Sequence, residues 1–176
     1  MEERPDWRSL PLSNVEQSDP NVNYRVDIQW AVDPEGFPHE SQMTDWIRRT
    51  LESTDRTAPV EVTVRVVDEE EMTGLNEQYR KKHGPTNVLS FPVGIEDEEQ
   101  RTLLGDIVLC ADVVREEAER QGKSLEAHVA HMLVHGVLHL EGYDHLESGE
   151  AREMEKLEIC LMAQLGFSDP YEGDAS

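Results

Sequence analysis

The sequence predicts a single α+β domain, in which a small mixed four-stranded sheet is packed with helices around a central His-bearing helix. Segments that alternate apolar and polar residues fall in the first two thirds of the chain, whereas helical periodicity fills the last third. One helix in that last third is apolar on almost every side, which is typical of a central, buried helix. This order of strands and helices predicts an α+β fold, and 176 residues are enough for one ordinary domain.

Four strands are expected from the alternating segments. Residues 24–30 form the first, and the β-branched run at 60–67 forms the second. Residues 87–93 and 103–113 form the third and fourth, with an acidic, solvated loop between them. Helices are predicted around 43–51 and over 68–80, where acidic residues at the start suit the positive end of the helix dipole.

Three further helices are expected at 113–122, 124–141 and 148–165. Ser124 is the predicted N-cap of the middle one, and Gly122 is a predicted C-terminal cap of the helix before it. Residues 1–22 have no periodicity and are expected to be a flexible N-terminal arm. Residues 23–166 are then the folded domain, and 167–176 are a loose, acidic C-terminal tail.

The cysteines and the hydropathy suggest an intracellular protein. Cys110 lies in an apolar run and Cys160 in a helical pattern, so both thiols are expected to be buried and free. No basic-then-apolar signal segment and no apolar stretch of membrane-spanning length is present. A soluble, cytoplasmic location is the expectation.

Strong acidity is the feature that argues against a nucleic-acid ligand. The chain has 16 Lys and Arg against 38 Asp and Glu, a net charge of −22, and phosphate affinity depends on basic residues. However, residues 1–20, 96–99 and 169–176 hold −10 of that charge. The one concentrated basic cluster is Arg80, Lys81, Lys82 and His83. RNA is therefore not excluded, but binding to naked RNA should be weak and salt-sensitive.

The segment HGVLHLEGYDH, residues 135–145, predicts a metal site. His135 and His139 are four residues apart on a predicted helix, so their rings project from one face. Gly142 ends the helix, and the short turn after it could return His145 as a third ligand. Three His with an open fourth position describe a catalytic zinc site, in which bound water becomes a nucleophile near neutral pH.

These histidines have two other interpretations. Surface or core histidines are less favoured, because the helix is otherwise apolar and buried imidazoles need partners. Glu141 and Asp144 are expected to accept hydrogen bonds from the ligand rings, and His131 to line the cleft. The spacing also matches the metzincin pattern H-E-x-x-H-x-x-G-x-x-H, except that Gly136 replaces the general-base Glu. Peptide hydrolysis is therefore an alternative.

Three blocks in order carry a resemblance to a known family: residues 75–92 (LNEQYRKKHGPTNVLSFP), residues 105–110 (GDIVLC) and HGVLHLEGYDH. Together they resemble the YbeY family of bacterial endoribonucleases, also called rRNA maturation factors, over about residues 23–166. The resemblance implies a zinc-dependent, single-strand-specific endoribonuclease acting in small-subunit rRNA 3′-end maturation and ribosome quality control. It makes 23–166 a metal-dependent endoribonuclease domain with one zinc ion per chain, held by His135, His139 and His145.

The resemblance also assigns residues to the reaction. It carries Arg80 over as a functional residue of the cleft, and we expect Arg80 and His135 to be catalytic. Arg80, Lys81, Lys82 and Ser90 are the expected substrate contacts. Single-stranded RNA, rRNA and the small ribosomal subunit are the implied partners, with no membrane and no DNA. A metal-dependent peptidase and a non-catalytic ribosome assembly factor with a structural zinc stay open as alternatives.

Overall fold

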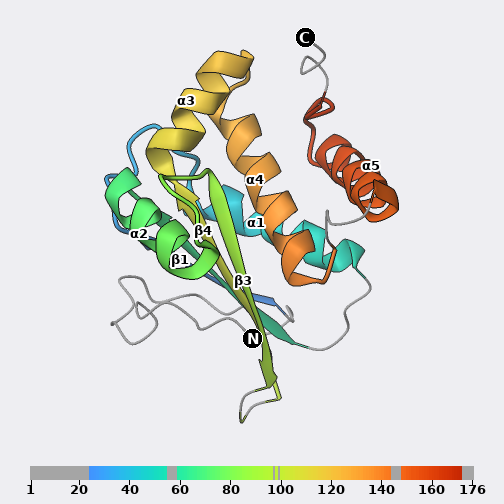
Figure 1. The fold of residues 1–176 in the computed structure, drawn as a ribbon. Helices are drawn as coiled ribbons and strands as arrows, with labels where there is room; N and C mark the ends of the chain where they lie inside the picture. Colours follow the sequence, from blue (N-terminus) through green and yellow to red (C-terminus); the bar gives the residue numbers. More distant parts are fainter. Residues whose placement is uncertain (1–23, 55–58, 97, 99, 144–147, 172–176) are drawn as a thin grey trace.

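A computed structural model describes residues 24–54, 59–96, 98, 100–143 and 148–171 of the chain. These residues form a four-stranded mixed sheet and five helices, which confirms the predicted α+β class (Figure 1). The elements in chain order are β1 (Tyr24–Trp30), α1 (Glu40–Ser53), β2 (Val60–Val67), α2 (Glu69–Arg80), β3 (Val88–Glu96), β4 (Thr102–Cys110), α3 (Ala111–Gln121), α4 (Leu125–Leu140) and α5 (Ser148–Gln164).

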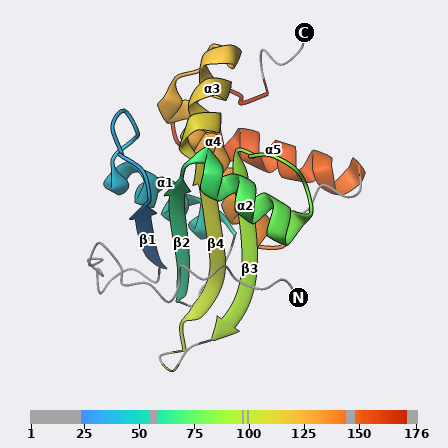
Figure 2. The same ribbon diagram turned by 60° about the vertical axis from the view of Figure 1, so that its left-hand side comes forward.

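The strand order places β3 at an edge of the sheet. The strands follow the order β1-β2-β4-β3, as Figure 2 shows. β1, β2 and β4 are parallel, with Val26 opposite Val62, and β3 is antiparallel to β4, with Ser90 opposite Ile107. The edge strand β3 therefore lies beside β4, which carries the second sequence block, and it also contacts α4, which carries the histidines of the third.

The two faces of the sheet are covered by different helices. The valines of β2 that alternate from Val60 to Val66 are buried in a large core that includes residues of α1 and α4. On the other face, Val67, Phe91 and Val108 form a smaller core with Met72 and Leu75 of α2. Side chains alternate along each strand, so the same β-branched sequence supplies both layers.

Helix α4 is the central helix that the sequence predicts. Eleven of its sixteen residues are buried, and it lies between the sheet and α5 (Figure 1). Ser124 caps it by accepting a hydrogen bond from the Ala127 N–H at 3.1 Å, as expected. The helix ends at Leu140, and Gly142 takes a φ of +104°, a conformation that glycine adopts at low cost.

Several local predictions differ from the structure. The β3–β4 hairpin is longer than expected, because β3 continues to Glu96 into the segment predicted as a loop. Helix α3 starts at Ala111 rather than at residue 113, directly after β4. Both thiols are free, but only Cys110 is buried; the prediction of a buried Cys160 is wrong. Cys160 does not share the face of α5 on which Met154 and Leu161 are buried.

The part of the C-terminal tail that is described belongs to the fold. Phe167 packs edge-on against Trp46, with ring centroids 5.7 Å apart. The Lys123 ammonium donates a hydrogen bond to the Pro170 carbonyl. The expectation of a loose tail is therefore wrong for residues 167–171, whereas the predicted arm at 1–22 lies outside the described residues. None of the described helices has the length and apolar character needed to cross a membrane.

Candidate active site

Four histidines form a row along one face of α4. His128, His131, His135 and His139 follow one another at spacings of three, four and four residues, so their side chains share a face. Successive ring centroids are 6.4, 6.4 and 5.4 Å apart. His128 and His131 are buried, whereas His135 and His139 are partly exposed. The row thus runs from the interior toward the surface, and it ends at the two residues expected to bind metal.

The structure brings His135 and His139 together but does not place the third predicted ligand. Their rings are the closest pair of the row, at 5.4 Å between centroids. His145 and Asp144 lie outside the described residues. Within the described ranges, no three His, Cys, Asp or Glu side chains converge on a point that could hold a metal ion.

A carboxylate that the sequence reasoning missed lies beneath the row. Glu158 of α5 is fully buried, and its Oε1 is 2.7 Å from His135 Nδ1. Its Oε2 is 3.0 Å from His131 Nε2 and also accepts a hydrogen bond from the Tyr171 hydroxyl. One carboxylate therefore joins two histidines of α4 to the C-terminal segment.

The hydrogen bonds that Glu158 accepts keep its carboxylate ionised. Burial by itself would raise the pKa of Glu158, but hydrogen bonds from His131, His135 and Tyr171 outweigh it and hold that pKa at about 2. Burial and the neighbouring carboxylate raise the pKa of Tyr171, so its hydroxyl keeps its proton. Because an ionised carboxylate only accepts hydrogen bonds, the His135 proton that faces it is on Nδ1. Nε2 is then the nitrogen of His135 that can coordinate a metal.

A second carboxylate binds the buried end of the row. Glu117 of α3 has Oε1 2.9 Å from His128 Nε2, and it also accepts a hydrogen bond from Asn87 Nδ2 at 3.1 Å. Burial would raise the pKa of Glu117, but these two hydrogen bonds lower it overall. Asn87 in turn accepts from the Val88 N–H at 2.7 Å, which places it at the start of β3 as a structural residue. His128 is accordingly a core histidine with its own partner.

Arg80 is connected to the His-bearing helix through the edge strand. Its Nη2 donates to the Ser90 carbonyl at 2.6 Å, and its guanidinium lies 5.6 Å from the centre of the Phe91 ring. The Ser90 hydroxyl donates to the Gly136 carbonyl on the other face, at 3.5 Å. Ser90 thus links Arg80 to the residue that follows His135. Because the Ser90 side chain is buried in this link, its contact with substrate stays a prediction.

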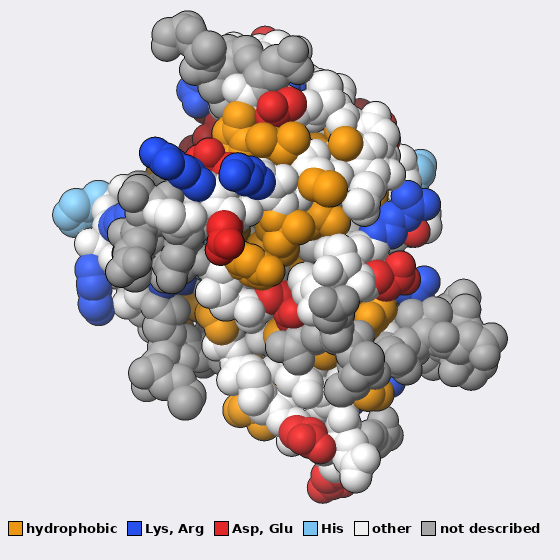
Figure 3. Space-filling model, turned by 90° about the vertical axis from the view of Figure 1, so that its right-hand side faces the viewer, with side chains coloured by type: hydrophobic (Ala, Val, Ile, Leu, Met, Phe, Trp, Pro, Cys, Tyr) orange, Lys and Arg blue, Asp and Glu red, His pale blue; other side chains and the backbone are white. Residues whose placement is uncertain are grey.

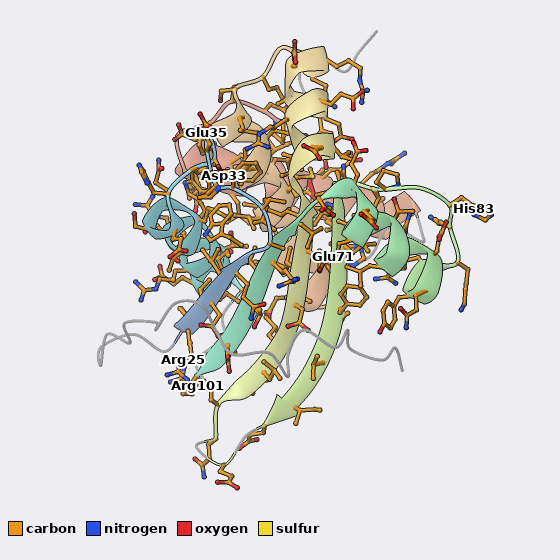
Figure 4. All side chains as sticks on the ribbon, turned by 90° about the vertical axis from the view of Figure 1, so that its left-hand side faces the viewer. Arg25, Asp33, Glu35, Glu71, His83 and Arg101 are labelled. Atoms are coloured by element: carbon orange, nitrogen blue, oxygen red, sulfur yellow. The ribbon has the colours of Figure 1, made fainter. Side chains whose placement is uncertain are left out.

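The two lysines of the basic cluster lie on the loop that follows α2. Lys81 takes a left-handed conformation at the end of the helix, and both Lys81 and Lys82 are exposed. His83 points away from the fold, as Figure 4 shows, and its Nδ1 is 3.7 Å from Glu77. The described contacts do not join these lysines to the histidine row. On the face shown in Figure 3, basic and acidic side chains border a band of hydrophobic ones, so the acidity is not uniform there.

Gly136, the position at which the sequence departs from the metzincin pattern, packs closely against the sheet. A Cβ at this position would lie 3.0 Å from both Cδ1 and Cγ2 of Ile107. Ile107 is fully buried in the sheet beneath α4. A side chain at position 136 therefore fits only if Ile107 shifts by a few tenths of an ångström, so a Glu there would press on the core beneath α4.

Comparison with known proteins identifies the family of the chain. The family model described as "Endoribonuclease YbeY" matches residues 29–166. The chain belongs to the YbeY endoribonuclease family. The solution structure of TM1509 from Thermotoga maritima is similar in fold, with a TM-score of 0.53 and 28% sequence identity. The match covers 81% of this chain and 88% of that one. Membership supports a hydrolase that cleaves RNA and has a role in rRNA maturation.

Proposed function

We propose that this chain is a zinc-dependent, single-strand-specific endoribonuclease of small-subunit rRNA 3′-end maturation and ribosome quality control, working in the cytoplasm. Zinc dependence is supported by the closeness of His135 and His139, whose ring centroids are 5.4 Å apart. It is also supported by the hydrogen bond that Glu158 accepts from His135 Nδ1. A ligand histidine that donates its second N–H to a carboxylate is the usual arrangement at zinc sites.

The donor set fits zinc. His135, His139 and His145 would hold one ion, and three His with an open position are typical of catalytic zinc. When bound, zinc supplies a Lewis acid and an acidified water molecule. The imidazoles would hold the ion while Glu158 keeps His135 in one orientation, so these side chains would need little reorganisation during the reaction.

Arg80 supplies positive charge for a phosphate. Its hydrogen bond to the Ser90 carbonyl holds the guanidinium at the edge strand, one link away from Gly136. A guanidinium stays charged at any physiological pH and matches the geometry of phosphate oxygens. We infer that Arg80 binds the phosphate next to the scissile bond and stabilises the negative charge that grows during cleavage.

Partial burial of His135 supports a single-stranded substrate. Its side chain keeps 21% of its exposure, so a phosphate must approach α4 closely to reach it. A flexible single strand can bend its backbone toward such a position, whereas a duplex holds its phosphates on a rigid helix. The net charge of −22 further favours a substrate that the ribosome presents, because free RNA would be repelled by most of the protein surface.

The test is cleavage by zinc-reconstituted protein of a single-stranded RNA, the same RNA in a duplex, and the matching single-stranded DNA. We expect cleavage of the single-stranded RNA alone. His135→Ala and Arg80→Ala should abolish it in folded protein. Arg49→Ala is the matched control, because Arg49 forms a surface pair with Asp45, and it should cleave normally. Undiminished cleavage by repurified, zinc-free protein would refute the metal-dependent mechanism.

The same zinc-loaded and zinc-free proteins distinguish this function from two alternatives. If zinc removal melts the fold, the ion is structural, and the protein is a ribosome assembly factor rather than a metal-dependent nuclease. If the folded zinc-free protein loses cleavage, the ion is catalytic. A casein digest with zinc addresses the peptidase alternative, and we expect no digestion because Gly136 stands where a metzincin has its general-base Glu.

A further inference from the structure

We propose that Glu158 is a positioning residue of the metal centre: its carboxylate orients His135 for the ion, and His131 and Tyr171 hold that carboxylate in place. The inference rests on the proposed function, since it concerns the same ion. It adds Glu158 and Tyr171 to the site and gives His131 a supporting role; Tyr171 lies beyond the region that the family model matches.

The contact between Glu158 and His135 fixes the orientation of the His135 ring. Glu158 is fully buried, and its Oε1 is 2.7 Å from Nδ1 of His135. A carboxylate at that distance accepts a hydrogen bond from the ring and thereby selects one tautomer and one ring orientation. Nδ1 carries the proton, and Nε2 carries the lone pair that a metal requires. Without this contact the ring could rotate about χ2 and present either nitrogen.

The second step concerns what holds the carboxylate. Oε2 lies 3.0 Å from His131 Nε2 and accepts the Tyr171 hydroxyl. The Tyr171 ring packs edge-on against His131, at 5.3 Å between centroids. Tyr171 is itself anchored, because the neighbouring Pro170 carbonyl accepts a hydrogen bond from Lys123. Both oxygens of Glu158 are therefore engaged, and the carboxylate cannot rotate without breaking a buried hydrogen bond.

His131 is a support and not an alternative ligand. Its side chain is buried, and its Nε2 faces Glu158. Its Nδ1 is buried without a hydrogen-bond partner among the described residues. The ring thus has no nitrogen directed toward solvent, whereas His135 and His139 are partly exposed.

Zinc affinity of folded protein is the measurement that tests the role, by competition with a chromophoric chelator and without any RNA. Glu158→Ala should bind zinc about 10- to 100-fold more weakly than the wild type, the usual effect of losing a carboxylate behind a ligand histidine. Glu158→Met, which fills the same space with no oxygen, should show the same loss if the alanine variant is too unstable to purify. Glu158→Gln keeps one acceptor and should be intermediate, and Tyr171→Phe should lose less. Glu153→Gln, an exposed acid on the same helix, is the control and should bind as the wild type does.

A second readout separates positioning from simple stabilisation. Cobalt bound in place of zinc reports ligand geometry through its visible absorption, and we expect Glu158→Gln to change that spectrum. If the folded variants at position 158 melt at a lower temperature but bind zinc within twofold of the wild type, with an unchanged cobalt spectrum, the positioning role is wrong. His135→Ala distinguishes this failure from that of the proposed function: if it too binds zinc normally, the metal site itself is wrong.

Discussion

Two contacts between a carboxylate and histidine join α4 to its neighbouring helices, and they differ in what lies on the far side of each ring. Glu117 binds His128, whose Nδ1 is buried and has no partner within the part of the chain that the structure describes. Glu158 binds His131 and His135, and the His135 ring reaches the surface. The first contact can only hold α3 and α4 together, whereas the second also orients a ring toward a ligand. A carboxylate–histidine pair can therefore either hold two helices together or also orient a ring toward a ligand, and the exposure of the ring decides which of the two it does.

The histidines themselves provide the sharpest test of this comparison. His135→Ala should weaken zinc binding by more than about 100-fold, because it removes a ligand rather than the support behind one. His128→Ala should leave zinc affinity within about threefold but lower the free energy of unfolding by about 1–3 kcal/mol, since Glu117 loses a buried donor. Chelator competition and urea unfolding measure the two effects. Equal losses of zinc affinity would show that the two ends of the row are not distinct.

Substitution of Gly105 tests whether close packing at the end of α4 that carries His139 contributes more to the free energy of unfolding than packing on the exposed side of helix α2 does. A Cβ there would lie 2.4 Å from the Phe91 carbonyl oxygen and 2.7 Å from Leu140, at the end of α4 that carries His139. Gly105→Ala should therefore cost about 2–3 kcal/mol of unfolding free energy, because backbone must move.

Gly74 of α2 is the matched control for that change. It has no atom within 4 Å of an added Cβ, and alanine is the better helix former. Gly74→Ala should raise the free energy of unfolding by up to about 1 kcal/mol. A Gly105→Ala protein as stable as the wild type in urea unfolding would contradict the close approach of β3, β4 and α4.

Glu117→Gln examines the structural contact alone. The folded-state pKa of Glu117 lies below its ordinary value of 4.5, so its charge stabilises the fold above about pH 4.5 and ceases to do so as the pH falls through the lowered pKa. The variant should be about 1–2 kcal/mol less stable at pH 7, and the difference should shrink in acid. Unfolding in urea at several pH values measures this. Zinc affinity should not change, and a loss of more than threefold would place Glu117 in the metal centre.

The smallest expected effect concerns the exposed lysines, which lie in neither contact. Replacing Lys81 and Lys82 with Ala should weaken single-stranded RNA binding several-fold at low salt and leave the cleavage rate at saturating RNA unchanged. Each phosphate contact on a single strand contributes about 0.7 to the slope of log affinity against log salt, so the slope should fall by about 1.4. Fluorescence anisotropy across a salt series measures it. An unchanged slope would remove Lys81 and Lys82 from the substrate contacts.

Local patterns in the sequence predicted the fold class and the shared face of His135 and His139. The alternation in β2 and the cap at Ser124 depend on neighbouring residues, and so does the four-residue spacing of His135 and His139. The strand order β1-β2-β4-β3 and the length of the β3–β4 hairpin depend on contacts far apart in the chain, which local periodicity does not report.

Glu158 was missed because it lies on a different helix, 23 residues after His135. One signal was present: it follows Met154 by four residues and precedes Leu161 by three, so an acid interrupts the apolar face of α5. A buried acid needs donors, and the nearby histidine-rich helix could have supplied them. Tyr171 offered no such signal, because it follows the last helix in a segment without periodicity.

Contact between Gly136 and Ile107 also bears on how such a site can evolve. One substitution separates the histidine motif from that of a metzincin, yet the new Glu would need space that Ile107 fills. Emptying that space by Ile107→Ala would cost about 2–5 kcal/mol, a large part of the stability of an ordinary domain. A lineage passing from RNA cleavage to peptide cleavage would therefore have to repack Ile107 as well as change the residue that follows His135.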